Sequence, residues 1–137
     1  MMKTWILEAR FSAAHFYAQE KWTQEQNLQT FGRCFTPYGH GHNYRVQAEW
    51  RIETQTEMEN LRAIFLSVVD AFDHRHLNFD FPEFHQQIPT TEVLAQVLAE
   101  RLRGATPIPL LRLLLFEDLD IGACWEAHNS QPNSSNL

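Results

Sequence analysis

The chain is poor in several features that mark particular classes of protein. It has 137 residues but only two cysteines, Cys34 and Cys124, which are too few for a disulfide framework. It has no basic run, and 11 Lys and Arg against 17 Asp and Glu give a net charge of −6, so no nucleic-acid partner is expected. No stretch is long and apolar enough for a signal segment or a membrane span. We therefore expect a cytoplasmic protein without a membrane partner.

Two segments carry the alternating pattern of half-buried β-strands. In residues 4–15 the apolar and small side chains hold the odd positions, and in residues 42–52 they hold the even positions. His15 ends the apolar face of the first segment, whereas His40 and His42 begin that of the second. If the two strands pair antiparallel, the three imidazoles converge at one end of the pair.

Three neutral imidazoles leave a tetrahedral zinc ion one open position for water or substrate, which is the pattern of a catalytic site. The alternative is that these histidines are hydrogen-bonded core residues, since that is the commoner role of a lone His on an apolar face. A purely structural zinc site is a further alternative. Three histidines at paired strand ends favour metal binding by His15, His40 and His42.

The rest of the chain predicts two helices followed by two strands. Residues 57–72 have helical spacing, and a second helix is expected from Thr90 or Thr91 to Gly104. Residues 110–116 predict a buried strand with a hairpin partner at 122–127. The order β-β-α-α-β-β predicts an α+β fold, in which two helices cover one face of an antiparallel sheet.

The ends and the connections complete this prediction. Residues 1–127 are expected to form a single domain, and the polar residues 128–137 a disordered tail. Residues 19–30 are too polar for a core element and predict an excursion between the first two strands, with room for a short helix. The open edges of such a sheet invite pairing with other subunits.

Three further positions are candidates for chemistry. Cys34 precedes His40 in a Cys-x5-His spacing, and a nearby cation is expected to lower the pKa of its thiol; the alternative is an ordinary loop cysteine. In Asp73–His74 the carboxylate is able to orient the imidazole for proton transfer, although helix capping is the alternative. Glu117 follows the apolar phase of its strand and needs a partner, such as a ligand with adjacent N–H groups, unless it begins a turn. His76 and His85 are expected to be surface loop residues.

Several motifs occur together in a recognisable order. They are Phe11-Ser12-Ala13-Ala14-His15, Cys34-Phe35-Thr36-Pro37-Tyr38-Gly39-His40-Gly41-His42-Asn43-Tyr44, Asp73-His74, Pro89-Thr90-Thr91-Glu92 and Phe116-Glu117. In these motifs the chain resembles the 6-pyruvoyl-tetrahydropterin synthase and 6-carboxytetrahydropterin synthase family from about residue 4 to 125. The resemblance implies a tunnelling fold (T-fold) with a four-stranded antiparallel sheet. It also implies a homohexamer, in which two trimeric barrels stack and the active sites lie between subunits.

The resemblance also implies roles for individual residues. His15, His40 and His42 correspond to ligands of Zn²⁺, and Cys34 to the general base. Asp73 and His74 correspond to a proton relay. The pterin substrate would be anchored by Glu117, with help from Thr90, Thr91 and Glu92.

The implied activity is a zinc-dependent lyase that eliminates triphosphate from 7,8-dihydroneopterin triphosphate to give 6-pyruvoyl-tetrahydropterin. Cys-x5-His and the long excursion before Cys34 are similar to this branch. The alternative branch forms 6-carboxytetrahydropterin, acetaldehyde and triphosphate, a step toward queuosine. The chain departs from the family after its second strand, because Glu53–Glu57 replaces the usual Asp-Pro-x-Thr-Gly-Met-Val hairpin. This departure motivates a third reading, a zinc-containing pterin-binding paralogue without efficient turnover.

Overall fold

The computed structural model describes residues 3–128, so the predicted tail lies, apart from His128, outside the described residues. The regular elements are β1 (Thr4–His15), α1 (Gln24–Phe31), β2 (His40–Arg51), α2 (Gln55–Asp70), β3 (Arg75–His76), α3 (Leu77–Asp80), α4 (Thr91–Ala105), β4 (Leu110–Phe116) and β5 (Gly122–Glu126). Short 3-10 turns occupy Gly32–Cys34 and Pro82–Phe84. Among residues 3–128, no helix combines the length and the apolar character that crossing a membrane requires.

The elements form one sheet in the order β3-β1-β2-β4-β5. The four long strands pair antiparallel with their neighbours, and β3 pairs parallel with β1. The predicted α+β class is confirmed, but the predicted purely antiparallel, four-stranded sheet is not. The fifth strand arises because Arg75–His76 pairs with Ala13 and Ala14 at the end of β1.

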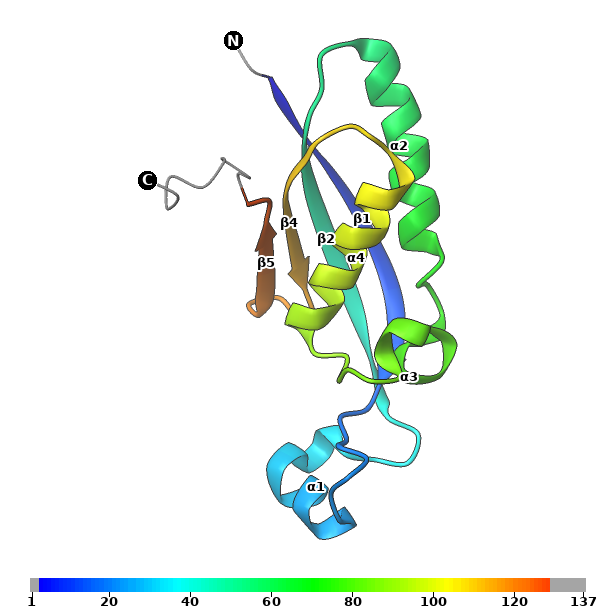
Figure 1. Cartoon of the computed structure of the whole chain (residues 1–137), viewed down its shortest axis with the longest axis vertical. Coiled ribbons are helices and arrows are strands. Elements are labelled where there is room, and N and C mark those ends of the chain that lie inside the picture. The colour runs from blue at the N-terminus through cyan, green and yellow to red at the C-terminus, as the bar shows by residue number, and fades with distance from the viewer. Residues whose placement is uncertain (1–2, 129–137) are drawn as a thin grey trace, which may run out of the picture.

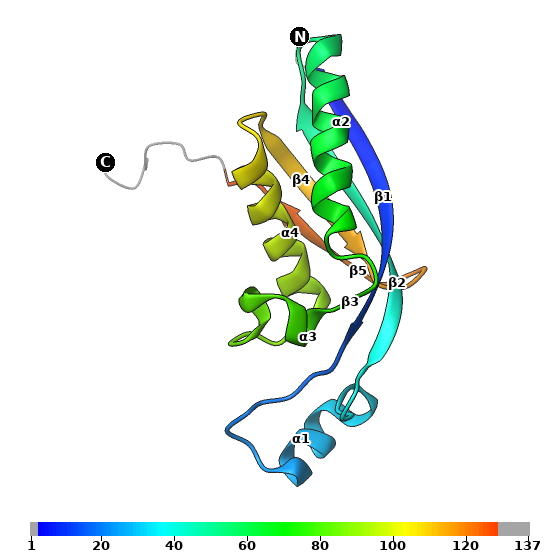
Figure 2. The ribbon, with the colours of Figure 1, turned by 90° about the vertical axis from the view of Figure 1, so that its right-hand side faces the viewer.

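The helices α2 and α4 lie on one face of this sheet, as expected, with α3 near the lower end of β1 (Figure 1). After a quarter turn, the opposite face of the sheet carries none of the helices of the described chain (Figure 2). The alternation in β1 and β2 explains this asymmetry, because only the apolar set of each strand faces the helices. The core contains fully buried side chains from the strand β2 and both long helices: Tyr44, Val46, Trp50, Leu61, Phe65, Leu94, Leu98 and Leu102.

Capping residues fix where the helices begin. The helix α2 begins two residues before the predicted position, because Thr54 and Glu57 form a capping box. Thr90 caps α4, since its hydroxyl accepts a hydrogen bond from the Val93 N–H at 3.2 Å. The predicted stop at Gly104 is wrong by one residue: Gly104 lies within the last turn, and the helix ends at Ala105.

The excursion between β1 and β2 forms α1, which projects beyond the lower end of the sheet (Figures 1 and 2). Thr23 and Gln26 form its capping box. Asn27 is buried and links α1 to the loop that precedes it. Its side chain forms hydrogen bonds with the backbone of Gln19 at 2.6 and 3.1 Å and with that of Thr23 at 3.0 Å. The excursion therefore has its own internal structure despite its polar composition.

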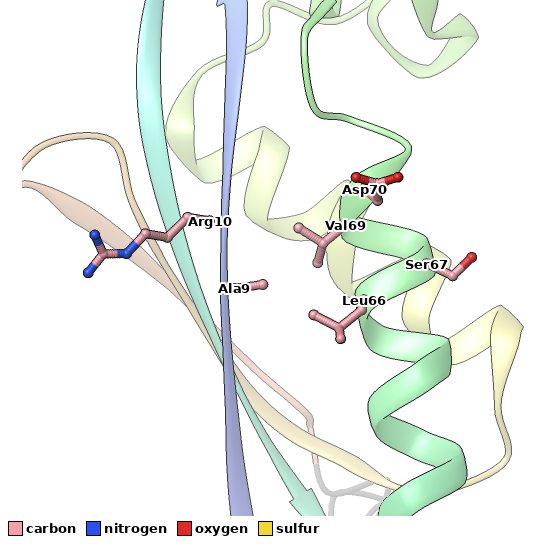
Figure 3. A pocket seen from close by; sticks show the side chains of 6 residues that line it. All are labelled: Ala9, Arg10, Leu66, Ser67, Val69 and Asp70. Atoms are coloured by element: carbon pink, nitrogen blue, oxygen red, sulfur yellow. The ribbon is translucent and has the colours of Figure 1, made fainter.

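The outer edge of β1 is only partly covered. Within the described residues, β3 pairs with Ala13 and Ala14 and leaves the first part of β1 without a neighbouring strand on that side. Beside this free edge, Ala9, Leu66 and Val69 line a shallow pocket between β1 and α2 (Figure 3). Leu66 is 44% exposed there.

Candidate metal centre and active site

The three histidines predicted as metal ligands meet at one end of the β1–β2 pair. The antiparallel register places His15 opposite His40 and Ala13 opposite His42. The Nε2 atom of His40 lies 3.3 Å from that of His15 and 3.1 Å from that of His42. Ligand atoms of a tetrahedral zinc ion are about 3.3 Å apart, given bonds of about 2.0–2.1 Å. The predicted convergence is confirmed, and this donor set could hold a metal ion.

The surroundings of His15 keep its imidazole in the form that binds a metal. The side chain is fully buried, and burial lowers its pKa to about 3, with smaller contributions from His42 and His40. The Tyr44 hydroxyl lies 3.1 Å from His15 Nδ1, so an Nδ1–H donated to this oxygen leaves the Nε2 lone pair free. Sequence reasoning treated Tyr44 as a core residue only, although it follows His42 by two positions on the same strand face.

A glycine allows the two strand ends to approach. Gly39 has φ of +79°, in the region that favours glycine. A Cβ atom at this position would lie 2.2 Å from the His15 carbonyl oxygen. The turn that delivers His40 therefore passes directly over the backbone of His15.

Glu117 lies beside the histidine cluster, at the end of β4. Its Oε1 atom is 3.6 Å from His42 Nε2, and the Thr91 hydroxyl donates a hydrogen bond to its other carboxylate oxygen. Thr91 is buried at the first residue of α4, which fixes the carboxylate against this helix. Thr90 and Glu92 were predicted to help Glu117 bind the substrate. The Thr90 hydroxyl is already used as the cap of α4, whereas the Glu92 side chain is exposed.

Cys34 ends a 3-10 turn, and its backbone carbonyl accepts a hydrogen bond from the Tyr17 N–H at 2.7 Å. This bond brings the end of the segment between β1 and β2 close to the end of β1. Burial raises the pKa of the Cys34 thiol, and the negative charge of Glu117 raises it further. The protein groups alone therefore raise the pKa of this thiol, and do not produce the fall that the sequence led us to expect from a nearby cation.

Tyr17 is a second aromatic residue that sequence reasoning missed. Its ring centroid lies 4.8 Å from that of His15. Burial raises the pKa of Tyr17, followed by the charges of Glu117 and Cys34, so these groups share one electrostatic environment. The residue lies in a polar loop without periodicity, and no pattern in the sequence indicates its position.

Asp73 and His74 interact with each other as predicted. His74 Nδ1 lies 2.9 Å from Asp73 Oδ2, while Asp73 Oδ1 accepts a hydrogen bond from the Ser12 N–H at 2.8 Å. These two contacts, the bond to Ser12 first, lower the pKa of Asp73. His74 has φ of +59°, a conformation that costs a non-glycine residue about 1 kcal/mol or more and is concentrated at functional sites.

The Asp73–His74 pair and Glu117 lie on opposite sides of the histidine cluster. The sheet order places the pair next to β1 and Glu117 after β4, with β2 between them. One groove runs from His74 to His42, and a second runs from His42 to Glu117. The two grooves share Gly41, His42 and Asn43, so His42 lies where they meet.

Comparisons with known proteins give a consistent result. The family model described as 6-pyruvoyl tetrahydropterin synthase matches residues 5–127. A relative from Pongo abelii called 6-pyruvoyl tetrahydrobiopterin synthase is 33% identical over 115 residues, which cover 78% of this chain and 79% of that protein. A relative of the same description from Poecilia reticulata is 36% identical over 107 residues, 73% of each chain.

Solved structures show the same likeness. The Caenorhabditis elegans 6-pyruvoyl tetrahydropterin synthase superposes with a TM-score of 0.84 at 29% identity, covering 93% of this chain and 97% of that one. A protein from Wolinella succinogenes, at 15% identity and a TM-score of 0.63, shares the fold over 93% of this chain and 99% of its own.

Proposed function

This chain belongs to the 6-pyruvoyl tetrahydropterin synthase family, and we propose that it is a zinc-dependent lyase that converts 7,8-dihydroneopterin triphosphate into 6-pyruvoyl-tetrahydropterin. The observation that carries the proposal is the convergence of the three Nε2 atoms beside Glu117. The relatives that match over about three quarters of the chain support the pyruvoyl product.

His15, His40 and His42 would hold Zn²⁺, and the ion would polarise the hydroxyl groups of the substrate side chain. The neutral His15 suits this role, because a protonated imidazole has no lone pair for a metal. The reaction needs no external oxidant or reductant. The side-chain carbinol next to the ring is oxidised to a carbonyl while the dihydropterin ring is reduced by the same two electrons. Elimination of triphosphate from the terminal carbon turns that carbon into a methyl group and the middle carbinol into the second carbonyl.

Glu117 would anchor the pterin ring. Its carboxylate is an acceptor for the adjacent N–H groups of the aminopyrimidine edge, and such paired charged hydrogen bonds are both strong and directional. Thr91 holds one carboxylate oxygen and so sets the orientation of the other. Thr90 and Glu92, at the same end of α4, complete the proposed pterin site.

Two proton transfers would use separate groups. The Cys34 thiolate would remove a proton from the substrate side chain, and His74 would return one elsewhere. Asp73 orients His74 through the 2.9 Å contact and is itself held by Ser12. The position of the pair on the far side of the cluster from Glu117 supports a division between pterin binding and proton delivery.

We also propose that residues 1–127 form one pterin synthase-like domain with the T-fold, and that six copies assemble as a dimer of trimers. Within residues 3–128, one face of the sheet carries no helix and the outer edge of β1 is only partly paired, and both features support this assembly. Edge strands of this kind pair readily with another chain, and closure into a barrel removes the edges.

Product analysis by mass spectrometry tests the activity. We expect incubation with 7,8-dihydroneopterin triphosphate to give 6-pyruvoyl-tetrahydropterin and triphosphate, and we expect chelator-treated protein or His42→Ala to give neither. Formation of 6-carboxytetrahydropterin and acetaldehyde would instead assign the chain to the alternative branch. Binding of the substrate without any release of triphosphate would show a pterin-binding paralogue.

A further inference from the structure

The metal ligand His15 lies at a vulnerable place in the fold. It is the last residue of β1, and after it the chain leaves the sheet without a regular element until Gln24. On one side His15 pairs with His40, but on the other side β3 reaches only Ala13 and Ala14. Strand ends with few hydrogen bonds are the first places to open. A further contact, in addition to the pairing with β3, is needed to fix the end of β1 at His15.

Asn78 supplies the missing contacts. The Phe16 N–H donates to Asn78 Oδ1 at 2.9 Å, and Asn78 Nδ2 donates to the Phe16 carbonyl at 2.9 Å. The side-chain amide thus takes both backbone groups of the residue after His15, as a neighbouring strand would. At the other end of β3, the Asp73 carboxylate also holds the backbone of β1, because it accepts a hydrogen bond from the Ser12 N–H.

The segment 73–78 therefore follows the edge of β1 from Ser12 to Phe16. The His74 N–H also donates to the Ser12 carbonyl, at 2.6 Å. The Phe16 ring adds an apolar contact to the same segment, since its centroid lies 5.6 Å from that of His76 and 5.5 Å from that of Phe79. Backbone and side chain of Phe16 are thus both held by residues about sixty positions later in the sequence.

We propose that Asn78 is a positioning residue for His15: by fixing the backbone of Phe16, it keeps the imidazole of His15 aimed at the metal. This inference rests on the proposed metal centre and assigns Asn78 no contact with metal or substrate. Fixing the strand end lowers the cost of ordering the three ligands when an ion binds. Groups that hydrogen-bond a metal ligand directly typically change metal affinity by about 10- to 100-fold when removed, and we expect an effect of this order from Asn78 through the backbone of Phe16.

Metal affinity of the Asn78 variants tests the proposal. We expect Asn78→Ala to bind Zn²⁺ about 10- to 100-fold more weakly than wild type in competition with a chromogenic chelator. Asn78→Asp retains an acceptor for the Phe16 N–H but loses the donor and places a negative charge beside the Phe16 carbonyl. We expect an intermediate loss, so this second variant serves if the alanine variant does not fold. With Co²⁺, the visible absorption of both variants should differ from that of wild type, because the ligand geometry changes.

Asn27 provides a matched control. It too is an asparagine that bonds backbone groups of a loop, but in the α1 segment. Asn27→Ala is expected to lower thermal stability while leaving zinc affinity and the Co²⁺ spectrum unchanged. Equal loss of affinity in Asn27→Ala and Asn78→Ala would reduce the effect to general destabilisation and would overturn the proposal.

The outcomes distinguish failure of the role of Asn78 from failure of the proposed metal centre. If wild-type protein binds neither Zn²⁺ nor Co²⁺, the proposed metal centre itself fails. If wild type binds and the folded Asn78 variants bind with the same affinity and the same Co²⁺ spectrum, the metal centre stands and the positioning role of Asn78 is wrong.

Discussion

A single side chain, His15, shows how the surroundings prepare a group for its chemistry. Its burial lowers the imidazole pKa to about 3, and Tyr44 occupies the ring nitrogen that faces away from the cluster. In the folded chain His15 is therefore neutral at neutral pH. Below the unfolded-state value of about 6.5 the unfolded chain binds the additional proton, so this residue disfavours folding as the pH falls.

Replacement of Cys34 tests its role as the general base. We expect Cys34→Ala to lower turnover by a factor of about 10² or more, because a positioned proton acceptor contributes this much. Zinc content and oligomeric state should not change, since the Cys34 side chain is not among the three proposed metal ligands. Cys124, exposed on β5, is the matched control, and Cys124→Ala should keep wild-type turnover. Undiminished turnover in Cys34→Ala would remove this residue from the mechanism.

Glu117→Gln tests the pterin anchor. The substitution keeps the shape of the side chain but removes the charge, and hydrogen bonds to charged groups contribute about 1.5–3 kcal/mol. We therefore expect pterin affinity to fall by about tenfold or more, as measured by fluorescence titration. Glu100→Gln, an exposed position on α4, is the control. If the two variants bind pterin with equal affinity, the ring must lie elsewhere.

The sequence predicted the three histidines at the ends of the two long strands. His15, His40 and His42 could be predicted because strand periodicity and antiparallel pairing dictate where they meet. Tyr17 and Asn78 could not, because Tyr17 lies in a loop and Asn78 lies in the four-residue helix α3, which is too short to show a period. Contacts between a side-chain amide and the backbone of a distant loop leave no pattern in a single sequence.

At the scale of elements, an ion pair joins the 3-10 turn Pro82–Phe84 to α4. Arg101 binds both carboxylate oxygens of Glu83, at 2.6 and 2.9 Å. Its guanidinium also lies over the rings of Phe72 and Phe81, at 5.0 and 5.1 Å from their centroids. The Glu83–Arg101 pair therefore connects the 3-10 turn to α4, and the contact of Arg101 with Phe72 connects α4 to the end of α2.

This contact predicts a pH dependence of stability. Arg101 lowers the pKa of Glu83 in the folded state, so the pair stabilises the fold above the unfolded-state value of about 4.5. This contribution is lost as the pH falls through the lower folded-state pKa. Glu83→Gln should reduce the free energy of unfolding by about 1–2 kcal/mol at neutral pH and flatten its decline in acid.

Urea unfolding at neutral and acidic pH measures this effect, with Glu59→Gln on the exposed side of α2 as the control. Parallel acid profiles for wild type and Glu83→Gln would show that Glu83 is not the titrating group.

The predicted elements were correct where they were long. The strands β1 and β2 and the helices α2 and α4 have clear periods, and their bounds fell within a few residues of the structure. The strand β3 and the helix α3 were missed, because two and four residues are too few to show a period. Their formation depends on the edge of β1, a neighbour that is distant in the sequence.

At the scale of the whole molecule, the helices of residues 3–128 cover one face of the sheet and leave the other face without a helix (Figure 2). Beside the free edge of β1, the exposed Leu66 lies next to Ala9 and Val69 (Figure 3). An apolar side chain at an unpaired edge is suited to contact with a second copy of the chain. The sequence predicted open sheet edges. It could not predict what pairs with each edge, because the proposed partners are other subunits.

Leu66→Glu tests the proposed hexamer. A charge in place of this apolar side chain should convert the assembly to smaller species in sedimentation velocity, because burying a charge at a subunit contact is costly. The circular dichroism spectrum should stay native, since Leu66 is 44% exposed within the chain. Asn60→Glu, at another exposed position of α2, should keep the wild-type assembly. A hexameric Leu66→Glu would place the subunit contact away from this pocket.

The close passage of Gly39 over His15 also matters to protein engineering. A group that transplants the three-histidine cluster onto another pair of antiparallel strands would copy three side chains and expect a binding site. With any other residue at the position of Gly39, the first side-chain carbon would overlap the His15 carbonyl oxygen, and the graft would splay its strands. The transferable unit is therefore four residues, and the fourth contributes by having no side chain at all.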